Sequence, residues 1–154
     1  TVPGVKNGQY FSNSYEHDED GHMTELSEKR IAMVDKRLKK LATITKNTPA
    51  PTLYGPKDAD VTLVGWGTTK GPVLDAIEGS RFNFIHFTWL YPFSPKATDM
   101  LKSCKRIIDI ENNATGQLAS LIREHTGIEI KDKILKYDGR PFYPEEIIER
   151  LKRL

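Results

Sequence analysis

"DVTLVGWGTTKGPVLDAI", residues 60–77, is the stretch that decides the fold. Its first half is rich in β-branched residues, as buried strands are, and its second half has the composition of a helix. Glycines gather where the two halves meet. In open α/β folds, the turn from a strand into a helix is where phosphates bind. The stretch therefore predicts a strand–helix unit and makes its turn a candidate anion site.

The same alternation continues to the end of the chain. Strands are expected within residues 60–67, 83–90, 105–111 and 132–139. Helices are expected within residues 70–79, 94–104, 114–127 and 143–154. Alternation of this kind implies right-handed crossovers between parallel strands. We therefore predict an α/β fold, a three-layer open and mainly parallel sheet with helices on both faces.

The first third of the chain has a different character. Residues 1–25 lack periodicity and are rich in turn formers, so we expect an irregular arm. A basic helix is predicted over residues 27–41, packed by an apolar stripe of Ile31, Val34, Leu38 and Leu41. Prolines place a linker at about residues 45–51. The predicted organisation is an arm with a helix over 1–48 and an α/β domain over 49–154.

Composition excludes several kinds of site. The chain has 154 residues and a formal charge of +2, which argues against a strong nucleic-acid-binding surface. Its single cysteine, Cys104, excludes an internal disulfide, a four-cysteine zinc site and a cysteine-ligated iron–sulfur cluster. The single cysteine favours a reducing cytoplasm. No apolar run approaches the roughly 20 residues of a membrane helix, so we expect a soluble protein. The opening "TVPGV" reads like the middle of a chain, which suggests a fragment of a longer protein.

The glycine turn departs from known phosphate-binding fingerprints. Gly65, Gly67 and Gly71 give G-x-G-x-x-x-G, one residue longer than the dinucleotide pattern, and Walker A is absent. The second strand is not followed by the acidic residue that would hold a ribose. We favour a packing turn, while Lys70 at the helix start keeps an anion site at Gly67, Lys70 and Gly71 open.

Two polar stretches are further candidates. Residues 15–25 hold potential metal ligands, but their spacing matches neither a zinc nor a calcium motif, so a solvated or capping segment is expected. At the carboxyl end of the third strand, either Asn113 caps the next helix, or Glu111, Asn112 and Gln117 form a patch for a partner. The sequence supports both equally. Elsewhere, we expect a buried Cys104 and a core His86 with satisfied hydrogen bonds.

Six stretches together resemble the end of the alpha subunit of 2-oxoacid:ferredoxin oxidoreductases, thiamine-dependent enzymes that decarboxylate 2-oxoacids to acyl-CoA. They are "YEHDEDGH" at 15–22, "MVDKRLKKL" at 33–41, "VGWGTTKGPVLDAI" at 64–77, "YPFSP" at 91–95, "ENNATGQLASLI" at 111–122 and "KYDGRPFYPEEI" at 136–147. The resemblance implies a transketolase C-terminal-like domain from about residue 50. It also implies that the arm and the basic helix lead out of a pyrimidine-binding domain.

The same resemblance implies that the chemistry lies outside this chain. The family's metal–diphosphate motif, cysteine-rich ferredoxin motif and "YPITP"-like substrate stretch are not in the sequence. We therefore expect no catalytic residue, cofactor or metal site here, and an inactive isolated chain with a structural role. The complete enzyme is expected to use thiamine diphosphate, Mg²⁺, iron–sulfur clusters and coenzyme A. Its expected partners are a thiamine-diphosphate-binding beta subunit and ferredoxin, in an oligomer without nucleic acid or membrane.

Candidate residues near an interface or the active site follow from the matching stretches. They are Glu16, His17, Asp18, Glu19, Gly21, Glu111, Asn113, Gly116, Gln117 and Arg140. Arg140 lies in the turn before the last helix, where its guanidinium is able to bind a carboxylate through two hydrogen bonds. Two alternatives from other classes are a stand-alone module that binds coenzyme A or another nucleotide at the glycine turn, and a basic helix that binds nucleic acid.

Overall fold

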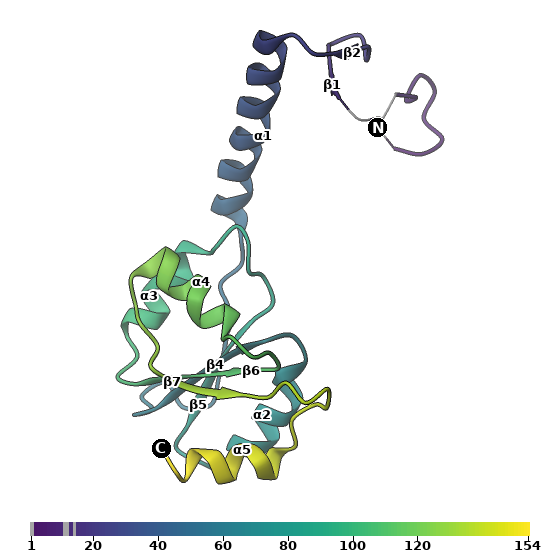
Figure 1. The fold of residues 1–154 in the computed structure, drawn as a ribbon. Coiled ribbons are helices and arrows are strands. Elements are labelled where there is room, and N and C mark those ends of the chain that lie inside the picture. The colour runs from purple at the N-terminus through teal and green to yellow at the C-terminus, as the bar shows by residue number, and fades with distance from the viewer. Residues whose placement is uncertain (1, 11–12, 14) are drawn as a thin grey trace. The chain divides into compact units, whose positions relative to one another are not determined.

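The computed structural model describes residues 2–10, 13 and 15–154. The chain divides into two compact units, Thr1–Ile44 and Thr45–Leu154. Figure 1 shows the helices and strands of both units. Among the described residues, no helix is both long enough and apolar enough to span a bilayer.

The first unit contains a short hairpin and most of a long helix. Strands β1 (Glu16–His17) and β2 (Met23–Thr24) pair antiparallel, so the arm is not irregular throughout as predicted. Helix α1 (Ser27–Asn47) runs past the residue at which the linker was predicted to begin. It ends just before Thr48, which precedes a proline and is therefore disfavoured in helical conformation.

Three of the four residues in the apolar stripe of α1 are exposed and the fourth, Leu41, is half-buried, contrary to the prediction that the stripe packs. None of the helix side chains is buried, and Ile31, Val34 and Leu38 are 62%, 37% and 56% exposed. Acidic residues of the hairpin contact the basic part of the helix instead. Arg37 donates two hydrogen bonds to the Glu16 carboxylate, at 2.9 and 2.7 Å. The hairpin thus binds α1 by charge, while Ile31, Val34 and Leu38 stay exposed.

The second unit is built on one sheet. Its strands are β3 (Thr52–Tyr54), β4 (Thr62–Trp66), β5 (Asn83–Phe87), β6 (Ile107–Glu111) and β7 (Asp132–Leu135). Their spatial order is β3-β5-β4-β6-β7, and all neighbours are parallel except β3, which pairs antiparallel with β5. The mainly parallel sheet is confirmed, whereas the edge strand β3 was not among the predicted strands.

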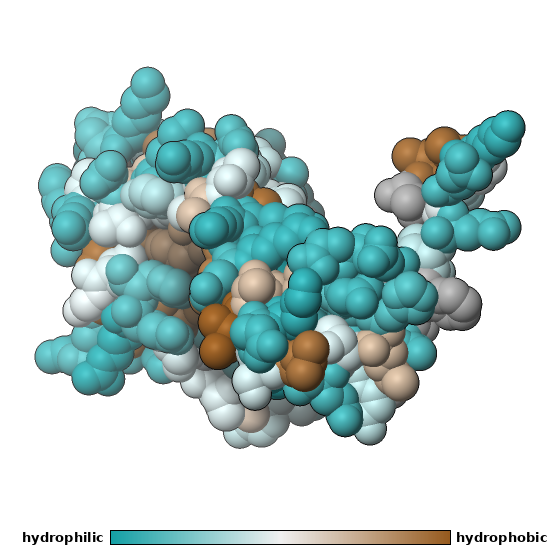
Figure 2. All heavy atoms as spheres, turned by 90° about the horizontal axis from the view of Figure 1, so that it is seen from above, coloured by the Kyte–Doolittle hydropathy of each residue, from teal (hydrophilic) through white to brown (hydrophobic). Residues whose placement is uncertain are grey.

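Helices cover both faces of this sheet, which confirms the predicted α/β class (Figure 1). They are α2 (Lys70–Ile77), α3 (Pro95–Lys102), α4 (Gln117–Thr126) and α5 (Pro144–Leu151), with a short 3₁₀ turn, η1 (Gly67–Thr69), before α2. One core forms where α3 and α4 pack on the sheet, around Leu101, Leu118 and Ile122. The other forms under α2 and α5, around Val73 and Ile147. On the face in Figure 2, hydrophilic residues predominate and hydrophobic ones are scattered among them.

Element ends differ from the predictions at several points. Strand β5 ends at Phe87 and β7 at Leu135, so the predicted strands were too long at their carboxyl ends. Helix α4 begins at Gln117 and not at residue 114, because Gly116 has a positive φ of 68° that an α-helix does not accept. Residues 112–116 therefore form a loop at the end of β6.

The direction of winding reverses between β4 and β6. From β4 the chain continues to β5 on one side, and from β5 it crosses to β6 on the other side of β4. As a result, the helices that follow β4 and β6 cover opposite faces and diverge. In open α/β sheets, a crevice opens at the carboxyl ends of such strands and is the usual place for a ligand.

Candidate functional site

Two pockets lie at the carboxyl ends of β4 and β6. The first has a volume of 330 Å³ and lies between the η1 turn and the loop after β6. The second has a volume of 490 Å³ and extends toward the loop after β7. Thr68 and Asn112 line both pockets. Together they form one open region, which we call the crevice, lined by Trp66, Gly67, Thr68, Thr69, Asn112, Asn113, Gln117, Lys136, Tyr137, Gly139, Arg140 and Pro141.

Glu111 organises the floor of the crevice. Its side chain is fully buried at the end of β6. One carboxylate oxygen accepts hydrogen bonds from Trp66 Nε1 at 2.8 Å and Asn113 Nδ2 at 2.7 Å. The other accepts from the backbone N–H groups of Leu118 at 2.8 Å and Ala119 at 3.4 Å. The carboxylate thereby caps the amino end of α4, where the helix dipole favours a negative charge.

Asn113 and Gly116 shape the loop above Glu111. Asn113 Oδ1 accepts from the backbone N–H groups of Thr115 at 3.0 Å and Gly116 at 2.8 Å, so this side chain closes the turn ahead of the helix. Of the two sequence interpretations, capping therefore describes the loop, but with Glu111 as the residue that binds the helix amides. Asn112 and Gln117 line the first pocket and remain candidates for contact with a ligand or partner.

Asp109 is a second buried carboxyl group on β6. It is fully buried, and neither side-chain oxygen has a hydrogen-bond partner within the described residues. Burial, followed by the neighbouring Glu111 carboxylate, raises the pKa of Asp109 to about 9, and Lys133 opposes this shift. A Cβ built on Gly116 would lie 3.2 Å from Asp109 Oδ2 and 3.1 Å from Lys133 Nζ. Asp109 thus lies directly under the loop that lines the crevice, and it holds a proton at neutral pH.

The three glycines of the opening motif have different local roles. A Cβ on Gly65 would lie 2.8 Å from Thr69 Oγ1 and 3.0 Å from the Ile110 carbonyl, so close packing requires glycine there. Gly67 has a positive φ of 60° and begins the η1 turn. Gly71 lies in α2 with no atom within 4 Å of its built Cβ. Gly65 and Gly67 depend on the absence of a side chain, and at Gly71 glycine suits a helical residue that precedes a proline.

The predicted anion site is only partly assembled around the crevice. Gly67 lines it, whereas Lys70 and Gly71 lie outside it. The Lys70 ammonium lies 5.0 Å from the centre of the Tyr54 ring. The Gly67 carbonyl is contacted by His86 Nε2 at 3.2 Å. The anion site at Gly67, Lys70 and Gly71 stays a prediction.

The loop after β7 contributes the basic wall of the crevice. Arg140, which was predicted from the sequence, lines the second pocket together with Lys136. Lys136 is only 5% exposed and donates to both oxygens of Glu146, at 2.7 and 2.6 Å. This ion pair lowers the pKa of Glu146 and fixes the start of α5 against the loop.

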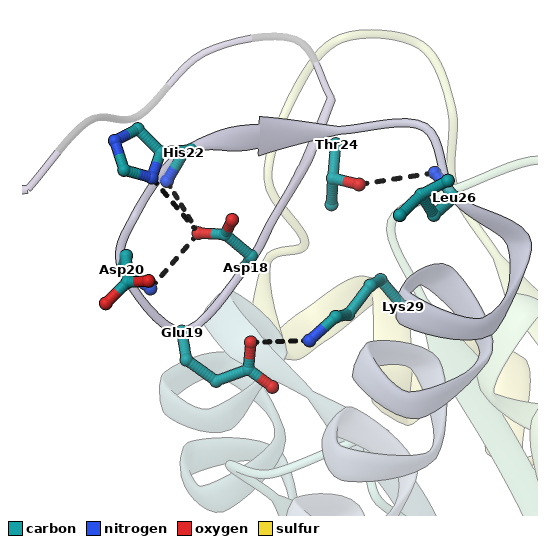
Figure 3. Close-up of polar contacts among 7 residues, drawn as sticks. All are labelled: Asp18, Glu19, Asp20, His22, Thr24, Leu26 and Lys29. Carbon is teal, nitrogen blue, oxygen red and sulfur yellow. Dashed lines mark hydrogen bonds and ion pairs between the residues drawn. The ribbon is translucent and has the colours of Figure 1, made fainter.

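The acidic hairpin forms a separate group in the first unit (Figure 3). Asp18 Oδ1 accepts from the backbone N–H groups of Asp20 at 3.1 Å and His22 at 2.8 Å, which closes the turn. Lys29 Nζ donates to Glu19 at 2.6 Å and ties the hairpin to α1. Gly21 takes the positive φ of the turn. The candidate site residues of the hairpin therefore stabilise the hairpin itself and its contact with α1.

Charge pairing within the hairpin has a clear electrostatic effect. The Arg37 guanidinium lowers the pKa of Glu16, the His22 backbone N–H lowers that of Asp18, and Lys29 lowers that of Glu19. His17, the remaining candidate there, has its Nε2 2.8 Å from Asn13 Oδ1. Asp18, Asp20 and His22 each have one potential metal-ligand atom, and these three atoms lie within 4.8 Å of one another. Of these three side chains, only that of Asp18 closes the turn, while Asp20 and His22 contribute their backbone N–H groups to it.

Two single-residue predictions need correction. Cys104 is partly exposed and not buried, although it packs against the α3–α4 core, because it follows the end of α3. His86 is buried as expected, but its Nδ1 has no hydrogen-bond partner in the described part of the chain. Burial lowers the pKa of His86, so the ring is held in its neutral form.

Comparisons with known proteins agree on one family, although no protein-family model matches the chain. The alpha subunit of 2-oxoacid:ferredoxin oxidoreductase 2 from Aeropyrum pernix is 38% identical over 148 residues, covering 90% of this chain. The 2-oxoacid:ferredoxin oxidoreductase alpha subunit from Saccharolobus solfataricus is 38% identical over 146 residues and 89% of this chain. The chain is homologous to part of the alpha subunit of 2-oxoacid:ferredoxin oxidoreductases. It spans 23% of the length of each of these relatives.

Comparison of the fold with solved structures finds a 2-oxoacid:ferredoxin oxidoreductase as well. The 2-oxoglutarate:ferredoxin oxidoreductase from Magnetococcus marinus, solved with 2-oxoglutarate, coenzyme A and succinyl-CoA bound, matches with a TM-score of 0.79 at 28% identity. The match covers 99% of this chain and 28% of that one. The resemblance stated from sequence motifs is therefore confirmed by identity and by structure.

Sequence reasoning missed several residues of the crevice. Trp66, Thr68, Asp109 and Lys136 were not candidates, although each lines the crevice or lies beneath it. Asp109 carried a usable signal, because it alternates with isoleucines two residues before Glu111 and so shares a sheet face with it. Lys136 gave no such signal, since its burial depends on Glu146 ten residues away.

Proposed function

We propose that this chain is the carboxyl-terminal part of the alpha subunit of a 2-oxoacid:ferredoxin oxidoreductase and serves there as a structural and assembly domain. The homology, 38% identity over 90% of the chain, carries the proposal. The local chemistry supports it, because Glu111 and the hairpin carboxylates are engaged by their own fold. On this proposal, residues 1–48 end a pyrimidine-binding domain and residues 49–154 form a transketolase C-terminal-like domain.

The complete enzyme would convert a 2-oxoacid to acyl-CoA by oxidative decarboxylation and pass electrons to ferredoxin. Thiamine diphosphate supplies the carbanion chemistry when bound. We assign it, with Mg²⁺, to a beta subunit, and we place the iron–sulfur cluster and the coenzyme A site outside this chain. The residues here fit these groups poorly, since the one cysteine is too few for a cluster and Asp18 is occupied with turn hydrogen bonds. An oligomeric enzyme in the cytoplasm completes the proposal.

The apolar stripe of α1 is the assembly surface that we propose. Ile31 and Leu38 lie on one side of the helix and expose more than half of their side chains. Exposed apolar faces of this kind are covered in complexes. We assign the cover to the remainder of the alpha subunit, because the relatives are far longer than the segment that this chain matches.

The test uses the complete alpha subunit co-expressed with its thiamine-diphosphate-binding partner. The double variant Ile31→Gln/Leu38→Gln is expected to lower the yield of folded alpha subunit, and therefore of assembled complex, severalfold, with unchanged turnover per assembled complex. Turnover is the coenzyme A-dependent reduction of a viologen dye, assayed without oxygen over a panel of 2-oxoacids. Lys36→Gln/Lys40→Gln, on the opposite side of α1, is the matched control.

Two results would overturn different parts of the proposal. A wild-type yield of complex from the stripe variant would show that the stripe does not contribute to assembly. The absence of both a co-purifying partner subunit and dye reduction with every 2-oxoacid would remove the oxidoreductase function.

A further inference from the structure

The crevice has the place and the dimensions of a ligand site that an assembly role does not use. It lies at the carboxyl ends of β4 and β6, where the winding of the sheet reverses. Its two pockets, of 330 and 490 Å³, meet at Thr68 and Asn112. Small-molecule sites have volumes of about 300 to 1,000 Å³, so the crevice is large enough for an ordinary metabolite.

The charge of the lining favours an anion. No carboxylate is among the residues that line either pocket, because Glu111 beneath the first is fully buried and bound to four donors. Two cations, Lys136 and Arg140, line the second. Lys136 is neutralised by Glu146. The Arg140 guanidinium, by contrast, makes no ion pair or hydrogen bond within residues 15–154. An unpaired guanidinium beside a pocket is suited to bind a phosphate through two parallel hydrogen bonds.

Side chains at the rim of the crevice have unused hydrogen-bonding groups, whereas those on its floor do not. The side chains of Thr68, Asn112 and Gln117 line the pockets and make no hydrogen bond with any other residue that the structure describes. On the floor, Glu111 and Asn113 are fully engaged. The rim therefore offers a hydroxyl and two amides, the groups that recognise the polar edge of a heterocyclic ring.

Trp66 provides an aromatic wall in the first pocket. Its indole N–H is bound to the buried Glu111 carboxylate, so the ring is held in place before any ligand arrives. Aromatic side chains stack favourably on the flat faces of nucleobases. A ring at the first pocket and a cation at the second match a ligand with a flat base at one end and a phosphate at the other.

We propose that the crevice binds a nucleotide, with the phosphate held by Arg140 and Thr68 and the base placed beside Trp66 and recognised by Asn112 and Gln117. This site differs from the glycine turn considered from the sequence, because Lys70 and Gly71 take no part. The inference does not depend on the oxidoreductase function, since it rests on the lining of the crevice alone.

The test is isothermal titration calorimetry of the full chain with ADP. Saturable binding is expected, weakened about tenfold or more by Arg140→Gln, because a charge-assisted hydrogen bond is lost. Arg81→Gln removes the same charge from an exposed residue just before β5, at the amino ends of the parallel strands and away from the crevice. It is expected to leave the affinity within twofold. Asn112→Ala is expected to weaken ADP but not inorganic phosphate. Equal thermal unfolding of all variants confirms that they fold alike.

Three results would overturn the inference. They are the absence of saturable heat at millimolar ADP, an equal loss of affinity in the Arg140 and Arg81 variants, and adenosine binding as tightly as ADP. None of them bears on subunit assembly or dye reduction, so failure here is distinct from failure of the proposed function.

Discussion

Glu111 is the residue on which most of the crevice floor depends. All four of its hydrogen bonds come from donors, two to each oxygen. Glu111→Gln would replace one carboxylate oxygen by an amide NH₂ group, which is itself a donor. Either Trp66 and Asn113 or the backbone amides of α4 would then lose their acceptor. We expect a loss of about 2 to 4 kcal/mol in the free energy of unfolding, measured by urea titration.

A matched control is available on the exposed side of α4. Glu124→Gln makes the same chemical change at an exposed residue, and its effect is expected to stay within about 0.5 kcal/mol. If both variants lose the same stability, the buried carboxylate is not the cap of the helix.

Asp109 makes the stability of the chain dependent on pH. Its pKa is raised from an ordinary value of 3.8 to about 9, so between these values the folded chain holds a proton that the unfolded chain releases. Stability therefore falls as pH rises through this window, by up to about 1.4 kcal/mol per pH unit from this group. Asp109→Asn, which does not titrate, is expected to remove this slope and to be more stable than wild type at mildly alkaline pH.

Urea unfolding across this range of pH checks the expectation. Asp99→Asn, at an exposed position on α3, is the control and should keep the slope of the wild type. Parallel stability curves for wild type and Asp109→Asn would show that Asp109 is ionised in the folded chain.

At the scale of elements, the strand β4, the turn η1 and the helix α2 show which glycines the fold requires. Gly65→Ala would bring its Cβ within 3.0 Å of the Ile110 backbone oxygen, which cannot give way as a side chain does, so we expect a loss of about 1 to 3 kcal/mol. Gly71→Ala meets no atom beyond its chain neighbours, but it precedes Pro72, which disfavours a helical residue with a Cβ, so the gain in helix propensity is offset and we expect a change within about 0.5 kcal/mol. Thermal unfolding should shift clearly downward for Gly65→Ala and little for Gly71→Ala. Equal shifts would contradict this assignment.

The same elements show how far the sequence determines the structure. The unit from β4 to α2 was predictable because its periodicity, its glycines and its helix composition all lie within residues 60–77. Strand β3 was not, because it is held by pairing with β5 about thirty residues later, as in Thr52 opposite His86. The start of α4 was misplaced because its amides are capped by Glu111, six residues ahead of the helix, and not by an adjacent side chain.

The candidate site was predictable in the same uneven way. Glu111 ends β6, Asn113 follows β6 and Arg140 follows β7, and their place after or at the end of a parallel strand puts them at the carboxyl edge of the sheet. Which of these side chains makes hydrogen bonds within the fold depends on residues far along the chain. Trp66 binds Glu111 across 45 residues, and no local pattern reports such a contact.

At the scale of the whole molecule, the two units differ in where their stability resides. Every buried hydrophobic side chain of the described residues lies between Leu63 and Ile147, and none lies in α1. The sequence predicted the stripe on α1 correctly, but what covers an apolar face depends on the rest of an assembly. A helix without buried side chains opens locally at little cost in free energy.

Limited trypsin digestion follows from this difference. The exposed basic residues of α1 are expected to be cut first, leaving a fragment that retains the unit Thr45–Leu154 and resists further digestion. Mass spectrometry of the early products locates the cuts. Replacing Lys36, Arg37, Lys39 and Lys40 by glutamine should move the first cuts in α1 to the remaining Arg30 and Lys46 without changing the lifetime of the resistant fragment. First cuts within the sheet unit, for example at Arg123 in α4, would contradict this prediction. They would show that α1 resists local unfolding better than the sheet unit does.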